Sequence, residues 1–216
     1  MPPHDVYMET HLGGGAVMFN KRPAKHNIGI EIDRSVIDIR TNYNQIDIEL
    51  IHCDVVNYLK DYSFKGKEFV YCDPPYLRET RKKPARLYKY EYTLKQHIEL
   101  LKVIKQLPCM VMISGYESSL YKEYLNDWHT HSFKAGCQHG VAIEWLWMNY
   151  STPVELHDYR HLGNNFRERE RIKKKLKGWM SRVKSMPVLE RLSESETLLS
   201  RRQALLSALQ GVNEKY

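Results

Sequence analysis

The feature that most constrains the fold is a regular alternation of short apolar runs with amphipathic stretches up to about residue 150. Short runs rich in β-branched and aromatic residues predict strands. These are Val6–Glu9, Asn27–Ile32, Ile48–Cys53, Glu68–Cys72, Cys109–Ser114, His129–Lys134 and Val141–Asn149. Helical spacing of apolar residues predicts helices over Ser35–Tyr43, Val55–Tyr62, Leu94–Leu107 and Ser118–Trp128. Strands that alternate with helices form a mostly parallel sheet with helices on both faces, so we expect an α/β fold.

Two local patterns refine this expectation. Thr93, followed three residues later by Gln96, predicts a capped helix start before Leu94–Leu107. The connection Ala135–Gly140 between the last two strands is too short for a helix, so those strands should pair antiparallel. The expected sheet is therefore mixed and has seven strands.

The strand pattern stops after Pro153, which predicts a domain over residues 1–153 and a helical extension over 154–216. Helix formers fill residues 166–184, Pro187 interrupts them, and Leu192–Leu209 predicts a final helix. The extension holds 14 Lys and Arg against 8 Asp and Glu, whereas residues 1–150 hold 19 against 18. This excess of positive charge favours a polyanionic partner, although a solvated amphipathic helix would show the same pattern.

Several classes of protein are excluded or disfavoured. No run of about 18 apolar residues predicts a membrane span, and the first residues do not resemble a secretory signal. Four widely spaced cysteines indicate reduced thiols in a cytoplasmic protein. A zinc site was considered for His129, His131, Cys137 and His139, but their spacing fits no common zinc module, so we expect no metal.

The strongest chemical signal is the tetrapeptide Asp73-Pro74-Pro75-Tyr76, directly after an apolar predicted strand. Each proline fixes its own φ and restricts the residue before it, so the turn is rigid. Open α/β sheets bind ligands at the carboxyl ends of their strands. A rigid carboxylate and a neighbouring carbonyl at this edge suit a site that grips an amino group, although a structural turn is the alternative.

Three further predicted strands end in acidic or glycine-rich sequence. Glu9 precedes a turn that contains Gly13 and Gly15, where the backbone can approach a cofactor. Glu31 closes the second strand, a common position for a carboxylate that holds ribose hydroxyls, and Asp54 follows the third strand. The glycine spacing matches neither the dinucleotide fingerprint nor a triphosphate-binding loop.

Together these motifs resemble the Dam-like, DPPY-type adenine-specific DNA methyltransferases, including their phage and prophage members. The resemblance extends from Pro3 to about Pro153. Beyond the motifs above, it includes the stretches Ile113-Ser114-Gly115-Tyr116 and Glu144-Trp145-Leu146-Trp147-Met148-Asn149-Tyr150. It implies a Rossmann-like fold that uses S-adenosylmethionine (SAM). It also implies a leading Gly-Gly-Lys segment, and the printed sequence starts past that point, so we expect a chain without it.

The resemblance implies a role for each motif. Gly13 and Gly15 would pass close to the methionine part of SAM, and Glu9 would face its ammonium group. Glu31 would take the ribose hydroxyls, and Asp54 the amino group of the cofactor's adenine. Asp73 and the Pro74 carbonyl would accept hydrogen bonds from the target adenine, on which Tyr76 would stack after the base leaves the duplex.

Nucleic acid would be contacted by two basic regions. Residues 77–92 interleave tyrosines with basic side chains, and the predicted helix 166–184 is strongly basic. The candidate contacts are Arg78, Arg81, Lys82, Lys83, Arg86, Arg171 and Lys174. The expected function is methyl transfer from SAM to the amino nitrogen of adenine in DNA. The alternatives are an RNA adenine methyltransferase and a weak or inactive nucleic-acid-binding remnant or subunit.

Overall fold

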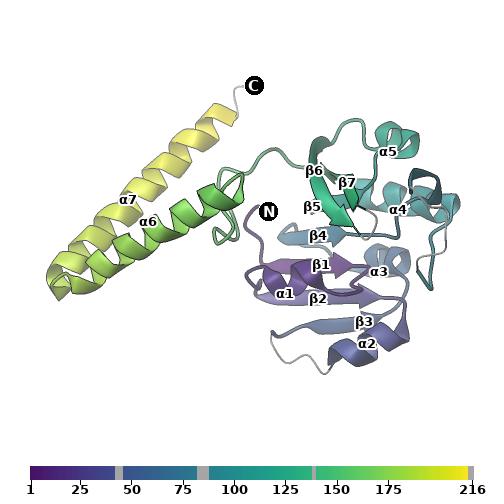
Figure 1. Ribbon diagram of the computed structural model, residues 1–216, viewed down its shortest axis with the longest axis horizontal. Coiled ribbons are helices and arrows are strands. Elements are labelled where there is room, and N and C mark those ends of the chain that lie inside the picture. Colours follow the sequence, from purple (N-terminus) through teal and green to yellow (C-terminus); the bar gives the residue numbers. More distant parts are fainter. Residues whose placement is uncertain (42–45, 82–87, 138–139, 214–216) are drawn as a thin grey trace. The chain divides into compact units, whose positions relative to one another are not determined.

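The computed structural model describes residues 1–41, 46–81, 88–137 and 140–213. The chain divides into two compact units, Pro3–Thr152 and a second unit that joins Met1–Pro2 to Pro153–Tyr216. The larger unit contains the sheet, and the smaller unit contains two long helices (Figure 1).

A single seven-stranded sheet, in the order β3-β2-β1-β4-β5-β7-β6, forms the centre of the larger unit (Figure 1). The strands are β1 (Val6–Thr10), β2 (His26–Glu31), β3 (Glu49–His52), β4 (Glu68–Cys72), β5 (Met110–Gly115), β6 (His129–Cys137) and β7 (Gly140–Met148). Strands β1 to β5 pair parallel with one another. Strand β7 pairs antiparallel with both β5 and β6. The predicted α/β fold with a mixed seven-stranded sheet is confirmed.

Helices follow the strands as the sequence predicts. In the larger unit they are α1 (Ala16–Asn20), α2 (Arg34–Thr41), α3 (Val55–Asp61), the 3₁₀ turn η1 (Arg78–Thr80), α4 (Leu94–Gln106) and α5 (Ser119–Tyr124). The expected capping box is present at the start of α4, where Thr93 and Gln96 satisfy each other's backbone N–H groups. The smaller unit holds α6 (Phe166–Ser185) and α7 (Val188–Asn213).

The main core lies between the central strands and the three helices α3, α4 and α5. Fully buried side chains of β1, β2, β4 and β5, such as Met8, Ile30, Val70 and Ile113, belong to one apolar cluster with residues of these helices. Burial of each such side chain stabilises the fold by about 1.5–3 kcal/mol. The central strands and their carboxyl ends are thus held rigidly.

Several elements differ from the prediction. Helix α1 was not predicted, because it has only five residues and its N-cap is Gly15, whose φ of 62° is left-handed. Strand β6 extends to Cys137 and β7 begins at Gly140, because cross-strand pairing continues to the end of this hairpin. Helix α7 begins at Val188, since a proline that ends one helix is tolerated at the start of the next.

Candidate active site

The acid-terminated strands meet at one edge of the sheet. Thr10 at the end of β1 lies opposite Ile30 of β2 on one side and Cys72 of β4 on the other. Glu31 at the end of β2 lies opposite His52 of β3. Because β3, β2, β1 and β4 are adjacent and parallel, the sequences that follow them emerge at the same edge. The motifs singled out in the sequence are therefore brought together there.

The turn after β1 requires glycine at two positions. Gly13 and Gly15 have φ values of 46° and 62°, which L side chains rarely adopt. A Cβ atom on Gly15 would also lie 2.5 Å from Cε2 of Phe19. The backbone is attached to β2 by two hydrogen bonds, from Leu12 N to the Ile30 carbonyl and from Gly13 N to Glu31 Oε2 (2.9 Å).

Glu31 organises this turn through its carboxylate. Oε1 accepts hydrogen bonds from the backbone N–H groups of Ile32 (2.9 Å) and Asp33 (3.0 Å), and Oε2 accepts the bond from Gly13. An ionised carboxylate has about four acceptor positions. One position on Oε2 thus stays available for a ligand hydroxyl, which is compatible with the expected ribose contact.

Glu9 is a buried carboxyl group at the end of β1. Its exposed fraction is 4%, and Tyr7 Oη donates a hydrogen bond to its Oε2 (2.9 Å). Burial raises the pKa of Glu9 to about 7, and the negative charge of Asp73 also acts to raise it. Glu9 and Asp73 are thus close enough to influence each other's ionisation.

Asp73 directly follows β4 and is held by Ser114 of β5. Ser114 Oγ donates a hydrogen bond to Asp73 Oδ1 at 2.7 Å. Burial raises the pKa of the Asp73 carboxyl, while hydrogen bonds from Ser114 and Tyr76 act in the opposite direction. The preceding residue, Cys72, is fully buried, and burial raises the pKa of its thiol to about 12. Cys72 is therefore a core residue and not a thiolate nucleophile.

The ring of Tyr76 is oriented by two neighbours. Tyr76 Oη donates a 3.4 Å hydrogen bond to Glu144 Oε2 on β7, and its ring meets the ring of Tyr116 edge-on at a centroid distance of 4.7 Å. Burial, and then the charge of Asp73, raise the pKa of Glu144. Glu9, Asp73 and Glu144 thus form a group of three carboxyls at the edge where the parallel strands end, since Glu144 precedes Trp145, which pairs with Gly115 at the end of β5.

Asp54 follows β3 and caps the start of α3. Its Oδ1 accepts a hydrogen bond from the backbone N–H of Asn57 at 3.0 Å. Oδ2 has no partner among the residues that the structure describes. The sequence position expected to contact the cofactor's adenine therefore has a structural role and one carboxylate oxygen left for a ligand.

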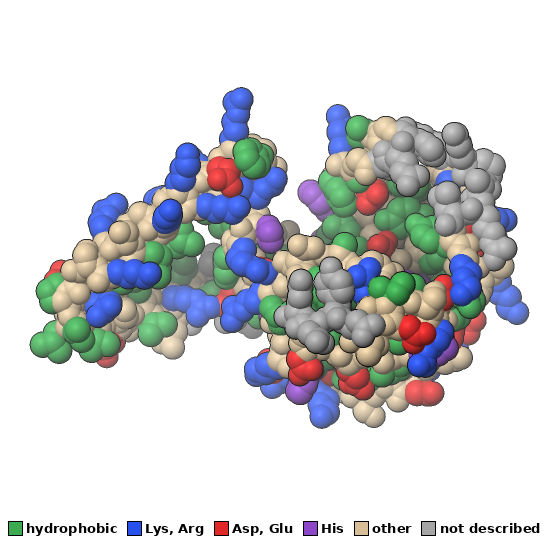
Figure 2. All heavy atoms as spheres, turned by 60° about the horizontal axis from the view of Figure 1, so that its bottom comes forward, with side chains coloured by type: hydrophobic (Ala, Val, Ile, Leu, Met, Phe, Trp, Pro, Cys, Tyr) green, Lys and Arg blue, Asp and Glu red, His purple; other side chains and the backbone are tan. Residues whose placement is uncertain are grey.

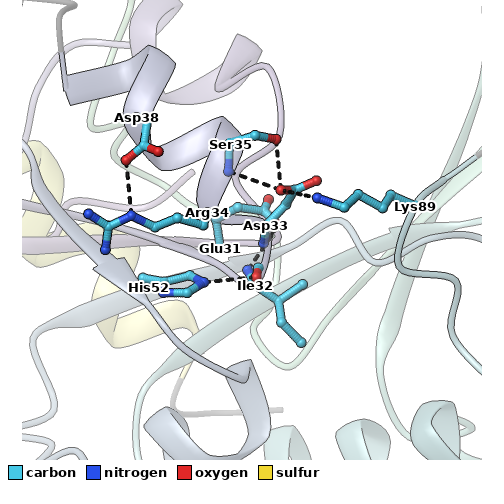
Figure 3. A network of polar contacts seen from close by, with 8 residues as sticks. All are labelled: Glu31, Ile32, Asp33, Arg34, Ser35, Asp38, His52 and Lys89. Atoms are coloured by element: carbon cyan, nitrogen blue, oxygen red, sulfur yellow. Dashed lines mark hydrogen bonds and ion pairs between the residues drawn. The ribbon is translucent and has the colours of Figure 1, made fainter.

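A polar network extends from Glu31 along the end of β2 (Figure 3). Asp33 Oδ1 accepts hydrogen bonds from the backbone N–H and the hydroxyl of Ser35, and it pairs with Lys89 Nζ at 2.9 Å. His52 contacts the Ile32 carbonyl at 3.0 Å from the neighbouring strand. Lys89 reaches this network from the segment 77–92, as Figure 3 shows.

Arg81 differs from the expectation. Its side chain is only 4% exposed and forms a two-pronged ion pair with Glu91, from Nη1 to Oε1 (2.9 Å) and from Nη2 to Oε2 (2.7 Å). Arg81 also donates to the Tyr76 carbonyl. The guanidinium is occupied within the protein, because planar Arg–carboxylate pairs are the geometry that this side chain favours. Arg81 therefore braces the segment beside Tyr76 and does not present a phosphate contact.

The other candidate nucleic-acid contacts are placed unevenly. Arg78 is exposed in η1, whereas Lys82, Lys83 and Arg86 lie outside the described residues. A cavity of about 670 Å³ is lined by Leu77, Arg78, Glu79, Lys89, Tyr90, Glu91, Tyr92, Thr93 and Leu94. Arg171 and Lys174 are exposed on α6, and Figure 2 shows Lys and Arg side chains along the helices of the smaller unit.

Among the described residues, no group of His, Cys, Asp and Glu side chains has the arrangement of a metal site. His139, one of the residues weighed for zinc, lies outside those residues. Within the same described part of the chain, no helix has the length and hydropathy needed to cross a membrane.

Sequence reasoning assigned no role to several residues that the structure places at this edge. They are Tyr71, Ser114, Tyr116, Glu144 and His11. His11 contacts Tyr92 Oη at 2.8 Å, and it has a φ of 59°, unusual for a residue other than glycine. The stretches around Ser114 and Glu144 supported the family resemblance, but only strand register shows which of their side chains face Asp73 and Tyr76.

The family comparison agrees with these motifs. Residues 34–136 match the family of D12 class N6 adenine-specific DNA methyltransferases, which confirms the resemblance and supports a methyltransferase. No curated protein matches the chain.

Several solved structures that are similar to this chain are described as methyltransferases. They include the N-methyltransferase NodS from Bradyrhizobium japonicum, with 9% identity, a TM-score of 0.48 and coverage of 69% of this chain and 88% of that one. TrmK of M. capricolum, solved with S-adenosyl-homocysteine, has 7% identity, a TM-score of 0.46 and coverage of 94% and 92%. An rRNA methylase from Streptococcus thermophilus has 13% identity, a TM-score of 0.45 and coverage of 68% and 88%.

Proposed function

Because residues 34–136 match the D12 class N6 adenine-specific DNA methyltransferase family, we propose that this chain transfers a methyl group from SAM to the exocyclic amino nitrogen of adenine in DNA. The observation that carries the proposal is the position of Asp73. It lies at the same sheet edge as Glu9, the glycine turn and Glu31, where β1 and β4 run side by side. A carboxylate that can accept hydrogen bonds from an amino group thus lies next to a candidate cofactor site.

The residues present fit a cationic cofactor. Glu9, Asp73 and Glu144 place three carboxyl groups in a partly desolvated region, where burial raises the pKa of each. A bound cation relieves the cost of ionising such groups together. SAM supplies an activated methyl group on a sulfonium, and it carries a second positive charge on its ammonium. Glu9 would pair with the ammonium, and the left-handed turn at Gly13 and Gly15 would let the backbone approach the methionine part.

Two carboxylates would hold the nucleoside part of the cofactor. Glu31 keeps one acceptor position open on Oε2, which can take a ribose hydroxyl. Asp54 keeps Oδ2 open, which can take the amino group of an adenine ring. Both side chains are already held by backbone N–H groups, so little conformational freedom is lost when a ligand binds.

Asp73 and the Pro74 carbonyl would act on the target base. The lone pair of an adenine amino nitrogen is delocalised into the ring, so this nitrogen is a poor nucleophile. Two acceptors that bind its hydrogens localise the lone pair and orient it for in-line displacement. Positioning and electrostatics of this kind supply most of the rate, and no covalent intermediate with the protein is required.

Tyr76 would stack on the extruded base. Its ring orientation is fixed by the hydrogen bond to Glu144 and by the edge-on contact with Tyr116. A base that leaves the duplex loses stacking of a few kcal/mol, and an aromatic platform returns part of it. Tyr76 immediately follows the two prolines, so the platform and the acceptors move as one rigid unit.

The choice of nucleic acid as substrate is supported by charge and aromatic residues. Arg78, Tyr88 and Tyr90 are exposed in the segment 77–92, which also lines the cavity of about 670 Å³. That volume is in the range of pockets that hold small ligands. Residues 160–184 hold ten Lys and Arg against two Glu, which suits sequence-independent contact with phosphates.

The test is methyl transfer with labelled SAM to matched substrates. Unmethylated duplex DNA should accept label, whereas RNA of the same sequence should accept little, and Asp73→Ala should lower the rate by about 10²–10³-fold. A preference for RNA would mean that RNA, and not DNA, is the substrate. The proposed methyl transfer from SAM to adenine would still hold. DNA binding without SAM binding would show an inactive remnant and contradict the proposal.

A further inference from the structure

Ser114 has a position that the proposed function does not use. It lies on β5 next to β4, its exposed fraction is 2%, and three polar atoms surround its hydroxyl. Tyr71 Oη donates to Ser114 Oγ at 3.1 Å. The Ser114 hydroxyl lies 3.1 Å from the Cys72 carbonyl and 2.7 Å from Asp73 Oδ1.

Counting donors assigns the proton of Ser114. A serine hydroxyl has one proton, so it cannot donate fully to both the Cys72 carbonyl and Asp73. The contact with Asp73 is the shorter, and a bond to a carboxylate is about twice as strong as a neutral one. Tyr71 uses its own proton on Ser114, which leaves the serine proton directed at Asp73 Oδ1.

We infer that Tyr71 and Ser114 form a hydroxyl relay that orients the Asp73 carboxylate and keeps it an acceptor for the substrate amino group. Ser114 is thus a positioning residue, and Tyr71 supports it. The relay uses one acceptor position on Oδ1, so other positions of the carboxylate can accept the amino hydrogen. The inference rests on the proposed function, because it names what makes Asp73 competent for that role.

The relay opposes the effect of burial. Burial raises the pKa of Asp73, and a protonated Asp73 would have lost part of its acceptor capacity. The hydrogen bond from Ser114 acts in the opposite direction, because it stabilises the charged form. Removing the Ser114 hydroxyl should therefore raise the pKa of Asp73.

Other ionisable groups lie within electrostatic reach of Asp73. The carboxyls are Glu9 on β1 and Glu144 on β7, and the negative charge of Asp73 raises the pKa of both. Burial raises the pKa of the remaining neighbours, which are Tyr7, Tyr71, Cys72, Tyr76, Tyr88 and Tyr121. These groups stay neutral at neutral pH, so Glu9 and Glu144 are the neighbours whose titration must be followed with Asp73.

The first experiment is an NMR titration of side-chain carboxyl carbons in the full chain, with Asp73→Asn to assign the Asp73 resonance. Ser114→Ala should raise the pKa of Asp73, Tyr71→Phe should raise it less, and Ser114→Thr should restore it. Tyr121→Phe is the matched control, because it removes a buried tyrosine hydroxyl that bonds His97 and lies outside the relay. An unchanged pKa in both Ser114→Ala and Tyr71→Phe would overturn the inference, and so would an equal rise in Tyr121→Phe.

The second experiment follows methyl transfer to duplex DNA against pH in the same variants. Ser114→Ala should lower the rate at neutral pH by about tenfold and move the acid limb of the profile to higher pH, because a bond to a charged group is lost. Ser114→Thr should restore both. If the wild-type chain transfers no methyl group, the proposed function fails, while the NMR titration still decides whether Ser114 controls Asp73.

Discussion

Lys89 Nζ lies 2.9 Å from Asp33 Oδ1, so the segment 77–92 is joined by an ion pair to the end of strand β2 (Figure 3). The hydrogen bond from Lys89 lowers the pKa of Asp33. Asp33 is two residues beyond Glu31, whose carboxylate holds the glycine turn. One contact thus connects the segment expected to bind nucleic acid with the strand expected to bind the cofactor.

This ion pair predicts a gain in DNA binding when Asp33 is neutralised. Asp33→Asn should remove the negative charge that faces Lys89, raise the affinity for duplex DNA and steepen its dependence on salt by about one unit of log–log slope. The double variant Asp33→Asn with Lys89→Ala separates the freed lysine from the lost negative charge. A double variant that binds as tightly as Asp33→Asn alone would show that Lys89 makes no phosphate contact.

The ion pair between Arg81 and Glu91 predicts a loss of stability. Arg81→Ala should lower the free energy of unfolding by about 3–5 kcal/mol, because the Glu91 carboxylate, whose side chain is 12% exposed, would lose the cation that faces it. Replacing both residues by leucine should cost much less, since no charge is then left without a partner. Chemical denaturation measures both values. Equal losses in the single and double variants would argue against this account of the pair.

The pKa of Glu9 predicts a pH-dependent difference between the wild type and Glu9→Gln. Burial raises this pKa to about 7 from a usual value near 4.5, so the folded chain keeps a proton that the unfolded chain releases between these values. The contribution of Glu9 to stability therefore falls as pH rises from about 4.5 to 7, by about 3 kcal/mol in total. Glu9→Gln should gain stability relative to wild type over this range. Urea denaturation at pH 5 and pH 8 checks the sign, and a constant difference would contradict it.

The basic face of α6 predicts a salt-dependent effect on DNA binding. Replacing Arg171 and Lys174 together by glutamine should reduce the steepness of the salt dependence by about two units of log–log slope, because fewer counterions are released. Replacing Arg191 and Arg201 of α7 by glutamine makes the same change in net charge elsewhere in the smaller unit. Equal effects of the two changes would mean that net charge, and not α6, controls binding.

Patterns of hydropathy were sufficient to predict the architecture. They were insufficient to predict the shortest α-helix and the start of the longest one. Seven strands and the antiparallel final pair followed from alternation and from the short connection after residue 134. Helix α1 was missed because its start depends on a left-handed Gly15. The start of α7 at Val188 was missed because Pro187 was interpreted only as the end of a helix.

The residues of the candidate site were likewise predictable only in part. The acidic and glycine motifs at the strand ends were recognisable because each lies at the end of a predicted strand. The inward turn of Arg81 and the approach of Ser114 to Asp73 depend on which side chains face each other across distant segments. Linear sequence does not contain strand register, so these contacts became visible only in the structure.

The most direct measurement is mass spectrometry of nucleosides from duplex DNA that has been incubated with the full chain and SAM. The account predicts N6-methyladenine with the wild-type chain and a rate about 10²–10³-fold lower with Asp73→Ala. A wild-type chain that binds SAM and DNA but leaves adenine unmodified, or an Asp73→Ala variant that methylates as fast as wild type, would contradict it.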